Sequence, residues 1–163
     1  MARPDAIDLD RVYREHGHVV FRRARAILGS ESEAGEVLQE VFLLLLDRPS
    51  QFRGESSILT FLYGVTTRLC LGRMRKTRRR AALDERELAP RNSLDGAPSP
   101  DLTMDAAQLL ARLPERLAQV AIYYFVDEMT HDEIAELVGV SRRQVGNLIN
   151  RVQEEARRGA RAA

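Results

Sequence analysis

The stretch THDEIAELVGVSRRQVGNLINR, residues 130–151, constrains the fold more than any other part of the chain. Thr130 is followed three residues later by Glu133, and Ser141 begins a second pattern of the same kind. In such a pair the hydroxyl caps one backbone N–H while the later side chain reaches back to the cap residue, which marks a helix start. Gly139 lies between the two starts, where a residue with positive φ would turn the chain sharply. The stretch therefore predicts two short helices joined by a tight turn.

Apolar residues recur at steps of three and four within each of these helices, so each has one face to bury. This pattern is typical of a helix-turn-helix, whose second helix enters the major groove of DNA. Arg favours guanine edges and phosphates, whereas Gln and Asn favour adenine edges. The candidate DNA-reading residues are Arg142, Arg143, Gln144 and Asn147. A helical hairpin that only packs or binds protein is the alternative.

Gly146 lies inside the second of these helices, where glycine costs roughly 1 kcal/mol relative to alanine. Two interpretations stay open. The glycine allows close approach to a backbone, or it marks a helix whose DNA contacts have been relaxed.

Helical periodicity continues through the rest of the chain, and no strand pattern is long enough to compete with it. We expect helices over about 7–28, 31–47 and 58–80, followed by an acidic stretch rich in Pro, Ser and Gly at 84–104, which is typical of a flexible linker. The predicted fold is all-α, with a three-helix unit (5–83) and a helix-turn-helix unit (105–158) joined by this linker (84–104).

The composition is that of a globular protein without a secretion signal. The chain has 163 residues, of which 44% are hydrophobic. It has no apolar run of the roughly 18 residues that a membrane span needs, and its N-terminal stretch lacks an apolar signal core. We therefore expect a cytoplasmic protein. The single Cys70 excludes an internal disulfide, and its apolar helical surroundings are more typical of a core residue than of a reactive thiol.

Two further segments predict surfaces for partners. The run VFLLLL, residues 41–46, is apolar all round, so Leu43 and Leu46 must face either a neighbouring helix or a partner protein, and the sequence favours neither. The run RMRKTRRR, residues 73–80, has six basic side chains in eight, more than a helix dipole needs, which favours contact with nucleic acid over a solvated helix end.

The charge is unevenly distributed along the chain. Residues 1–83 carry 15 basic and 10 acidic side chains, whereas residues 105–163 carry 8 and 9. The helix-turn-helix unit is therefore not the basic one, which is unusual for a protein that reads DNA alone.

No pattern of catalytic residues is found. His16 and His18 are two residues apart on a helix and face different ways. No His, Cys and carboxylate cluster has metal-ligand spacing, and no Gly-rich phosphate loop or nucleophile elbow occurs. The sequence therefore predicts a protein that is not an enzyme and has neither a metal nor another cofactor.

The whole layout resembles a bacterial RNA polymerase sigma factor of the extracytoplasmic-function class, the minimal sigma factors with only the second and fourth conserved domains. The N-terminal match, residues 34–80, includes LQEVF, a loop phenylalanine and the basic helix end. The C-terminal match, residues 110–151, includes LPERL and the helix-turn-helix. The resemblance implies core RNA polymerase and promoter DNA as partners, with an anti-sigma factor as a possible regulator. Because polymerase then supplies much of the electrostatic attraction, the reading unit need not be basic.

The resemblance also implies roles for individual residues. The helix that contains VFLLLL would dock on the clamp helices of core polymerase through Leu38, Gln39, Glu40, Phe42, Leu43 and Leu46. The melted minus-ten element would be bound by Phe52, Arg53, Arg68, Arg73, Arg75, Lys76 and Arg78, since single strands are held by basic grooves and base pockets. The minus-thirty-five major groove would be read by Arg142, Arg143, Gln144 and Asn147, with Arg151 on phosphate.

The chain departs from the family pattern in the second helix of the helix-turn-helix. Gly146 replaces a usual lysine and Leu148 replaces a usual arginine, so two basic contacts are missing. In the N-terminal half, RLCLG at 68–72 replaces a usual N-L-A-x-D stretch. Two alternatives to a working sigma factor follow: a sigma-like interaction module with weakened promoter reading, and a stand-alone helix-turn-helix regulator.

Overall fold

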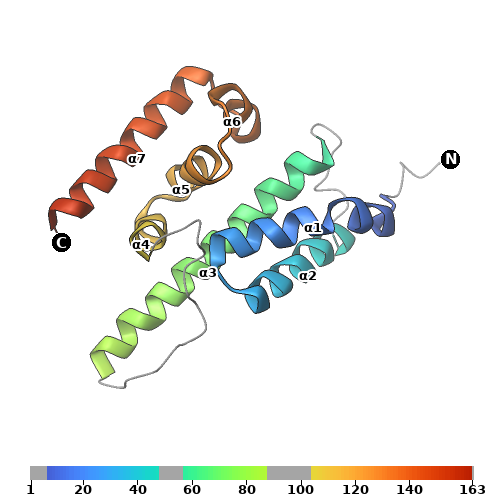
Figure 1. The fold of residues 1–163 in the computed structure, drawn as a ribbon, viewed down its shortest axis with the longest axis horizontal. Helices are drawn as coiled ribbons and strands as arrows, with labels where there is room; N and C mark the ends of the chain where they lie inside the picture. The colour runs from blue at the N-terminus through green and yellow to red at the C-terminus, as the bar shows by residue number, and fades with distance from the viewer. Residues whose placement is uncertain (1–6, 48–56, 88–103, 163) are drawn as a thin grey trace.

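The computed structural model describes residues 7–47, 57–87 and 104–162, and all regular structure in these ranges is helical (Figure 1). The predicted all-α fold is thus confirmed. The elements in chain order are α1 (Leu9–Leu28), α2 (Glu31–Asp47), α3 (Ile58–Glu87), α4 (Met104–Arg112), α5 (Glu115–Ala121), the π-helix η2 (Ile122–Val126), α6 (His131–Val138) and α7 (Arg142–Ala162).

Local signals set most helix ends. Helix α1 begins where the Asp8 carboxylate accepts a hydrogen bond from the Arg11 backbone N–H, and it ends at Gly29, whose φ is 72°. Helix α3 begins after Ser57, whose hydroxyl caps the Thr60 N–H at 3.2 Å. It continues to Glu87, beyond the end predicted near residue 80. The segment that follows the arginines, AALDERE, contains good helix formers and no Pro or Gly, so nothing stops the helix there. The rest of the predicted linker, 88–103, lies outside the described residues.

Helix α3 is the element shared by the two halves of the molecule. Helix α2 runs antiparallel to both α1 and α3, while α4 and α5 pack on α3 (Figure 1). Leu113, Leu117 and Ile122 belong to the same buried cluster as Val41 and Leu62. The two sequence units therefore do not stand apart in this structure, because they share one hydrophobic core.

The C-terminal half has a second cluster of its own. Val120, Tyr123, Ile134, Val145 and Ile149 are buried between α5, η2, α6 and α7. These contacts fix the geometry of the helix-turn-helix. Among the helices in the described ranges, none is long and apolar enough to cross a membrane.

Candidate nucleic-acid and protein interfaces

The helix-turn-helix has the predicted caps. Thr130 and Glu133 form a reciprocal capping box at the start of α6, and Gly139 ends that helix with φ 71°. At the start of α7 the Ser141 N–H donates to the Gln144 Oε1 at 2.9 Å, and the Gln144 N–H donates to the Ser141 Oγ at 3.2 Å. These short-range signals place the two helices as the sequence predicts.

The predicted DNA-reading side chains all lie on the exposed face of α7, while Val145, Ile149 and Val152 anchor its other face. These side chains differ in whether another group of the protein already holds them. The side-chain oxygen of Gln144 is held by the cap, and Arg142 lies 3.7 Å from the exposed Asp132 carboxylate. Within the described residues Arg143, Asn147 and Arg151 have no side-chain partner, so these three are the side chains most available to a ligand.

Gly146 is not required by packing inside the molecule. A Cβ placed there would come only as near as 4.0 Å to the His131 Cε1, which is ordinary van der Waals contact. No backbone of this chain therefore needs the glycine, and close approach of a partner's backbone stays a prediction. Leu148, at the usual arginine position, packs against both buried clusters.

Helix α2 presents an apolar face to solvent. Leu43 is 58% exposed and Leu46 is 61% exposed, so they cover no neighbouring helix among the described residues. The structure thus selects the outward-facing alternative for these two leucines. Phe42 differs, since its ring is 7% exposed and packs edge-on against Tyr13 with ring centroids 5.0 Å apart. The ring therefore belongs to the core in this structure, and a contact of Phe42 with a docking partner stays a prediction.

The other predicted docking residues on α2 have mixed environments. Leu38 is half-buried against the core, and Gln39 is exposed. Glu40 accepts a hydrogen bond from Arg73 at 3.2 Å, and Glu36 accepts a second one at 2.7 Å. This paired contact raises the pKa of the Arg73 guanidinium, and the largest cause is the hydrogen bond that Arg73 donates to Glu36. Arg73 therefore ties α3 to α2, and it is not a free cation for DNA as the sequence suggested.

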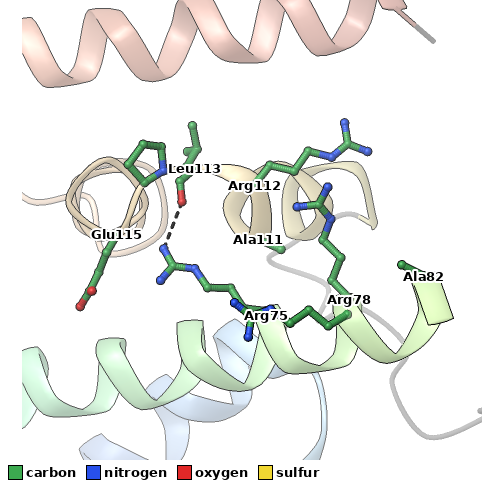
Figure 2. Close-up of a pocket in the computed structure, with 9 residues that line it drawn as sticks. Arg75, Arg78, Ala82, Ala111, Arg112, Leu113 and Glu115 are labelled. Carbon is green, nitrogen blue, oxygen red and sulfur yellow. Dashed lines mark hydrogen bonds between the residues drawn. The ribbon is translucent and has the colours of Figure 1, made fainter.

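The remaining basic residues on α3 are more accessible. Arg68, Lys76 and Arg78 are exposed. Arg75 is partly buried because its Nη2 donates to the Leu113 carbonyl at 3.1 Å, which links α3 to the turn after α4 (Figure 2). The candidates Phe52 and Arg53 lie outside the described residues.

Sequence analysis missed a buried polar contact between the two halves. The Arg23 side chain on α1 is 5% exposed and forms a bidentate salt bridge with Asp127, just after η2, at 3.2 and 2.6 Å. Its Nη1 also donates to the Tyr63 carbonyl at 3.2 Å and to the Thr67 Oγ1 at 2.6 Å, both on α3. The Arg23 guanidinium thus has partners in both halves of the molecule.

Aromatic rings complete the surroundings of this guanidinium. The Arg23 Cζ lies 4.4 Å from the Tyr63 ring centroid and 5.4 Å from that of Tyr123. A cation over aromatic faces is further stabilised when it is shielded from water. One sequence signal could have revealed this site: Arg23 lies at helical spacing between Val20 and Ile27, inside the buried stripe of α1.

No candidate metal centre is found among the described residues. Within the described ranges no group of three or more His, Cys, Asp or Glu residues could hold an ion. Cys70 is fully buried, and burial raises the pKa of its thiol to about 12. Its predicted place in the core is confirmed.

Comparisons with known proteins agree with this geometry. A model described as Sigma-70 region 2 matches residues 12–80, and one described as Sigma-70, region 4 matches residues 103–152. The ECF RNA polymerase sigma factor SigW of Bacillus subtilis (strain 168) is 24% identical over 168 residues, which cover 94% of this chain and 88% of SigW. The sigma factor RpoE of Bartonella quintana, solved with the anti-sigma factor NepR, matches in fold with a TM-score of 0.54 at 15% identity, over 94% of this chain and 97% of RpoE.

Proposed function

This chain belongs to the sigma-70 family of RNA polymerase sigma factors, in the extracytoplasmic-function class, and from that premise we propose how its surfaces divide the work of promoter-directed transcription initiation. The function is one of binding and positioning, so it needs no active site in this chain. It is carried out in the cytoplasm, where polymerase meets the promoter.

The outward apolar face of α2 is the proposed contact with core polymerase. The observation that carries this proposal is the exposure of Leu43 and Leu46, which lie three residues apart on one side of the helix. Burying a leucine side chain against a partner stabilises the complex by roughly 1.5–3 kcal/mol. Gln39 lies on the same helix, seven residues before Leu46, and would supply a polar contact at the edge of this face.

Promoter DNA is the proposed ligand of α3 and α7. Arg68, Lys76 and Arg78 would contact the melted minus-ten strand together with Phe52 and Arg53. A second set on α7 would enter the major groove of the minus-thirty-five element, namely Arg143 and Asn147 at base edges and Arg151 at phosphate.

We infer that the arrangement seen here does not read both promoter elements at once. By their names they lie about 25 base pairs apart, or roughly 85 Å at 3.4 Å per base pair. In this structure the two units share one core and the buried Arg23–Asp127 contact. We therefore infer that this closed arrangement is the free protein and that the units separate when polymerase and promoter bind.

The test is to replace both exposed leucines of α2 with aspartate. We expect Leu43→Asp with Leu46→Asp to abolish co-elution with core polymerase and protein-dependent transcripts from a genomic fragment library. Leu83→Asp is the matched control, because Leu83 is 59% exposed on α3. Circular dichroism must show that all variants keep their helices. A folded double variant that still co-elutes and transcribes as the wild type does would overturn the assignment.

A second candidate function is a sigma-like module that binds protein but reads promoters weakly. The observation in its favour is that Gln144 is held in a cap and that Leu148 faces the core, so fewer side chains on α7 can reach DNA. Co-elution with core polymerase without any transcripts would favour this module. An anti-sigma factor is a partner that we propose for either function, as RpoE of Bartonella quintana was solved with NepR.

A further inference from the structure

An arginine pocket lies between the basic end of α3 and the turn that joins α4 to α5 (Figure 2). It has a volume of about 560 Å³. Arg75, Arg78 and Arg79 line it from α3, and Arg112 lines it from the end of α4. Figure 2 shows Arg75 and Arg78 extending from α3 toward α4 and the following turn, with Arg112 at the outer edge. Both halves of the molecule therefore contribute to the pocket.

Among the residues that the structure describes, few carboxylates balance the positive charge of this arginine pocket. Within the described residues Arg78, Arg79 and Arg112 form no ion pair. Arg75 donates one hydrogen bond to the Leu113 carbonyl, which carries no charge. Glu115 is the one carboxylate among the lining residues, and it also accepts a hydrogen bond from Gln119 at 3.3 Å.

Arg73, on the same helix, is an arginine whose positive charge is balanced by carboxylates. Its guanidinium is paired with two carboxylates of α2, at 2.7 and 3.2 Å. The four guanidinium groups around the pocket have one carboxylate among them. Like charges brought together repel unless an anion neutralises them, and the described lining residues leave about two to three positive charges without a counter-charge.

We propose that the arginine pocket binds a small multivalent phosphate anion, of the kind that carries a di- or triphosphate group. The planar fork of guanidinium donors matches phosphate oxygens in charge and geometry. The volume lies in the range of about 300–1,000 Å³ that small-molecule sites occupy. A single monovalent anion would leave most of the positive charge unpaired.

Anion binding is coupled to the closed arrangement. Because α3 supplies one wall and the α4–α5 turn supplies the other, the complete site exists only while the two units are packed together. A ligand that binds one arrangement better than another shifts the population toward it. The anion therefore stabilises the closed molecule, and any change that opens the molecule weakens anion binding.

The first experiment measures the binding of inorganic tripolyphosphate to the full-length protein by titration calorimetry in about 150 mM NaCl, where the Debye length is about 8 Å. We expect Arg78→Ala and Arg112→Ala each to weaken binding by about tenfold, the effect of losing one charge-assisted contact. Arg80→Ala is the matched control, because Arg80 is an exposed arginine on α3 that does not line the pocket. We expect its affinity to stay within twofold of the wild type.

A second variant tests the coupling. Asp127 does not line the pocket, yet Asp127→Ala removes the salt bridge that holds the two halves together, so we expect it to weaken tripolyphosphate binding as well. Two results would overturn the proposal: no binding to the wild type, or equal losses in Arg80→Ala and the pocket variants. None of these measurements requires polymerase or a promoter, so they are independent of the proposed sigma function.

Discussion

Two glycines of the helix-turn-helix illustrate how differently one residue type is constrained. Gly139 has φ 71° and ends α6, a backbone conformation that side-chain-bearing residues rarely adopt. Gly146 lies within α7 and has open space around the position of a Cβ, with the nearest atom 4.0 Å away. The turn requires the first glycine. The second lies inside a helix, where glycine is a poor helix former and no packing contact requires it.

At this scale we predict opposite effects of the same substitution. Gly146→Ala should raise the free energy of unfolding by up to about 1 kcal/mol, the difference in helix propensity. Gly139→Ala should lower it by about 1–2 kcal/mol, since alanine is strained in the left-handed region. Urea unfolding followed by circular dichroism measures both. A destabilised Gly146→Ala variant would contradict the open space seen beside that position.

At the scale of an element, α6 depends on its N-terminal cap. The Glu133 carboxylate accepts hydrogen bonds from the Thr130 N–H at 2.7 Å and from the Thr130 Oγ1 at 2.8 Å. The hydrogen bond from the Thr130 backbone, followed by that from its hydroxyl, lowers the pKa of Glu133 below its usual 4.5. A carboxyl whose pKa is lowered in the folded state stabilises that state above the unfolded pKa, and it loses this effect as the pH falls through the folded pKa.

We therefore predict a pH-dependent difference between the wild type and Glu133→Gln. The glutamine can still reach back to the Thr130 N–H, but it cannot carry the charge. The wild type should have the higher thermal midpoint at pH 7, and the gap should shrink as the pH falls below about 4.5. Glu136→Gln, the same change one turn later in α6, should alter the midpoint less. A gap that is constant from pH 7 to pH 2 would contradict the role of the ionised cap.

At the scale of the whole molecule, the closed arrangement depends on a buried ion pair within a shared apolar core. Arg23 and Asp127 have side-chain exposures of 5% and 13%, and the Arg23 donors are satisfied by partners in both halves. Breaking such a pair by removing one partner costs about 3–5 kcal/mol, because the other charge is left buried and unpaired. If the two units separate, the charge left without a partner becomes solvated and this cost is relieved.

Asp127→Ala should therefore open the molecule. We expect a larger radius of gyration by small-angle X-ray scattering and a lower thermal midpoint than in the wild type, with helix content kept. Asp132→Ala is the matched control, since its contact with Arg142 is fully at the surface and 3.7 Å long. Surface pairs of this kind contribute about 0–1 kcal/mol, so this variant should keep the wild-type radius. An unchanged radius in Asp127→Ala would show that apolar contacts alone close the two units.

The sequence by itself determined the features that depend on neighbours three or four residues away. The capping boxes at Thr130 and Ser141, the turn at Gly139 and the buried stripes of the helices were all predicted from such spacings. The same local rules predicted the core position of Cys70. The end of α3 was predicted too early, at the end of the basic run. Nothing in the residues that follow this run stops a helix, and α3 continues to Glu87.

Only the tertiary structure decided which of the patterned residues are free to act. The Phe42 ring packs against Tyr13, and Arg73 pairs with carboxylates 33 and 37 residues away. Arg75 donates a hydrogen bond to the Leu113 carbonyl. Arg23 found Asp127 across 104 residues of chain. A contact between residues so far apart in the sequence cannot be predicted from residue spacing in either segment, because it depends on how whole helices pack around α3. Charge and apolar pattern therefore indicated candidate surfaces, and packing selected which of those residues remain available to a partner.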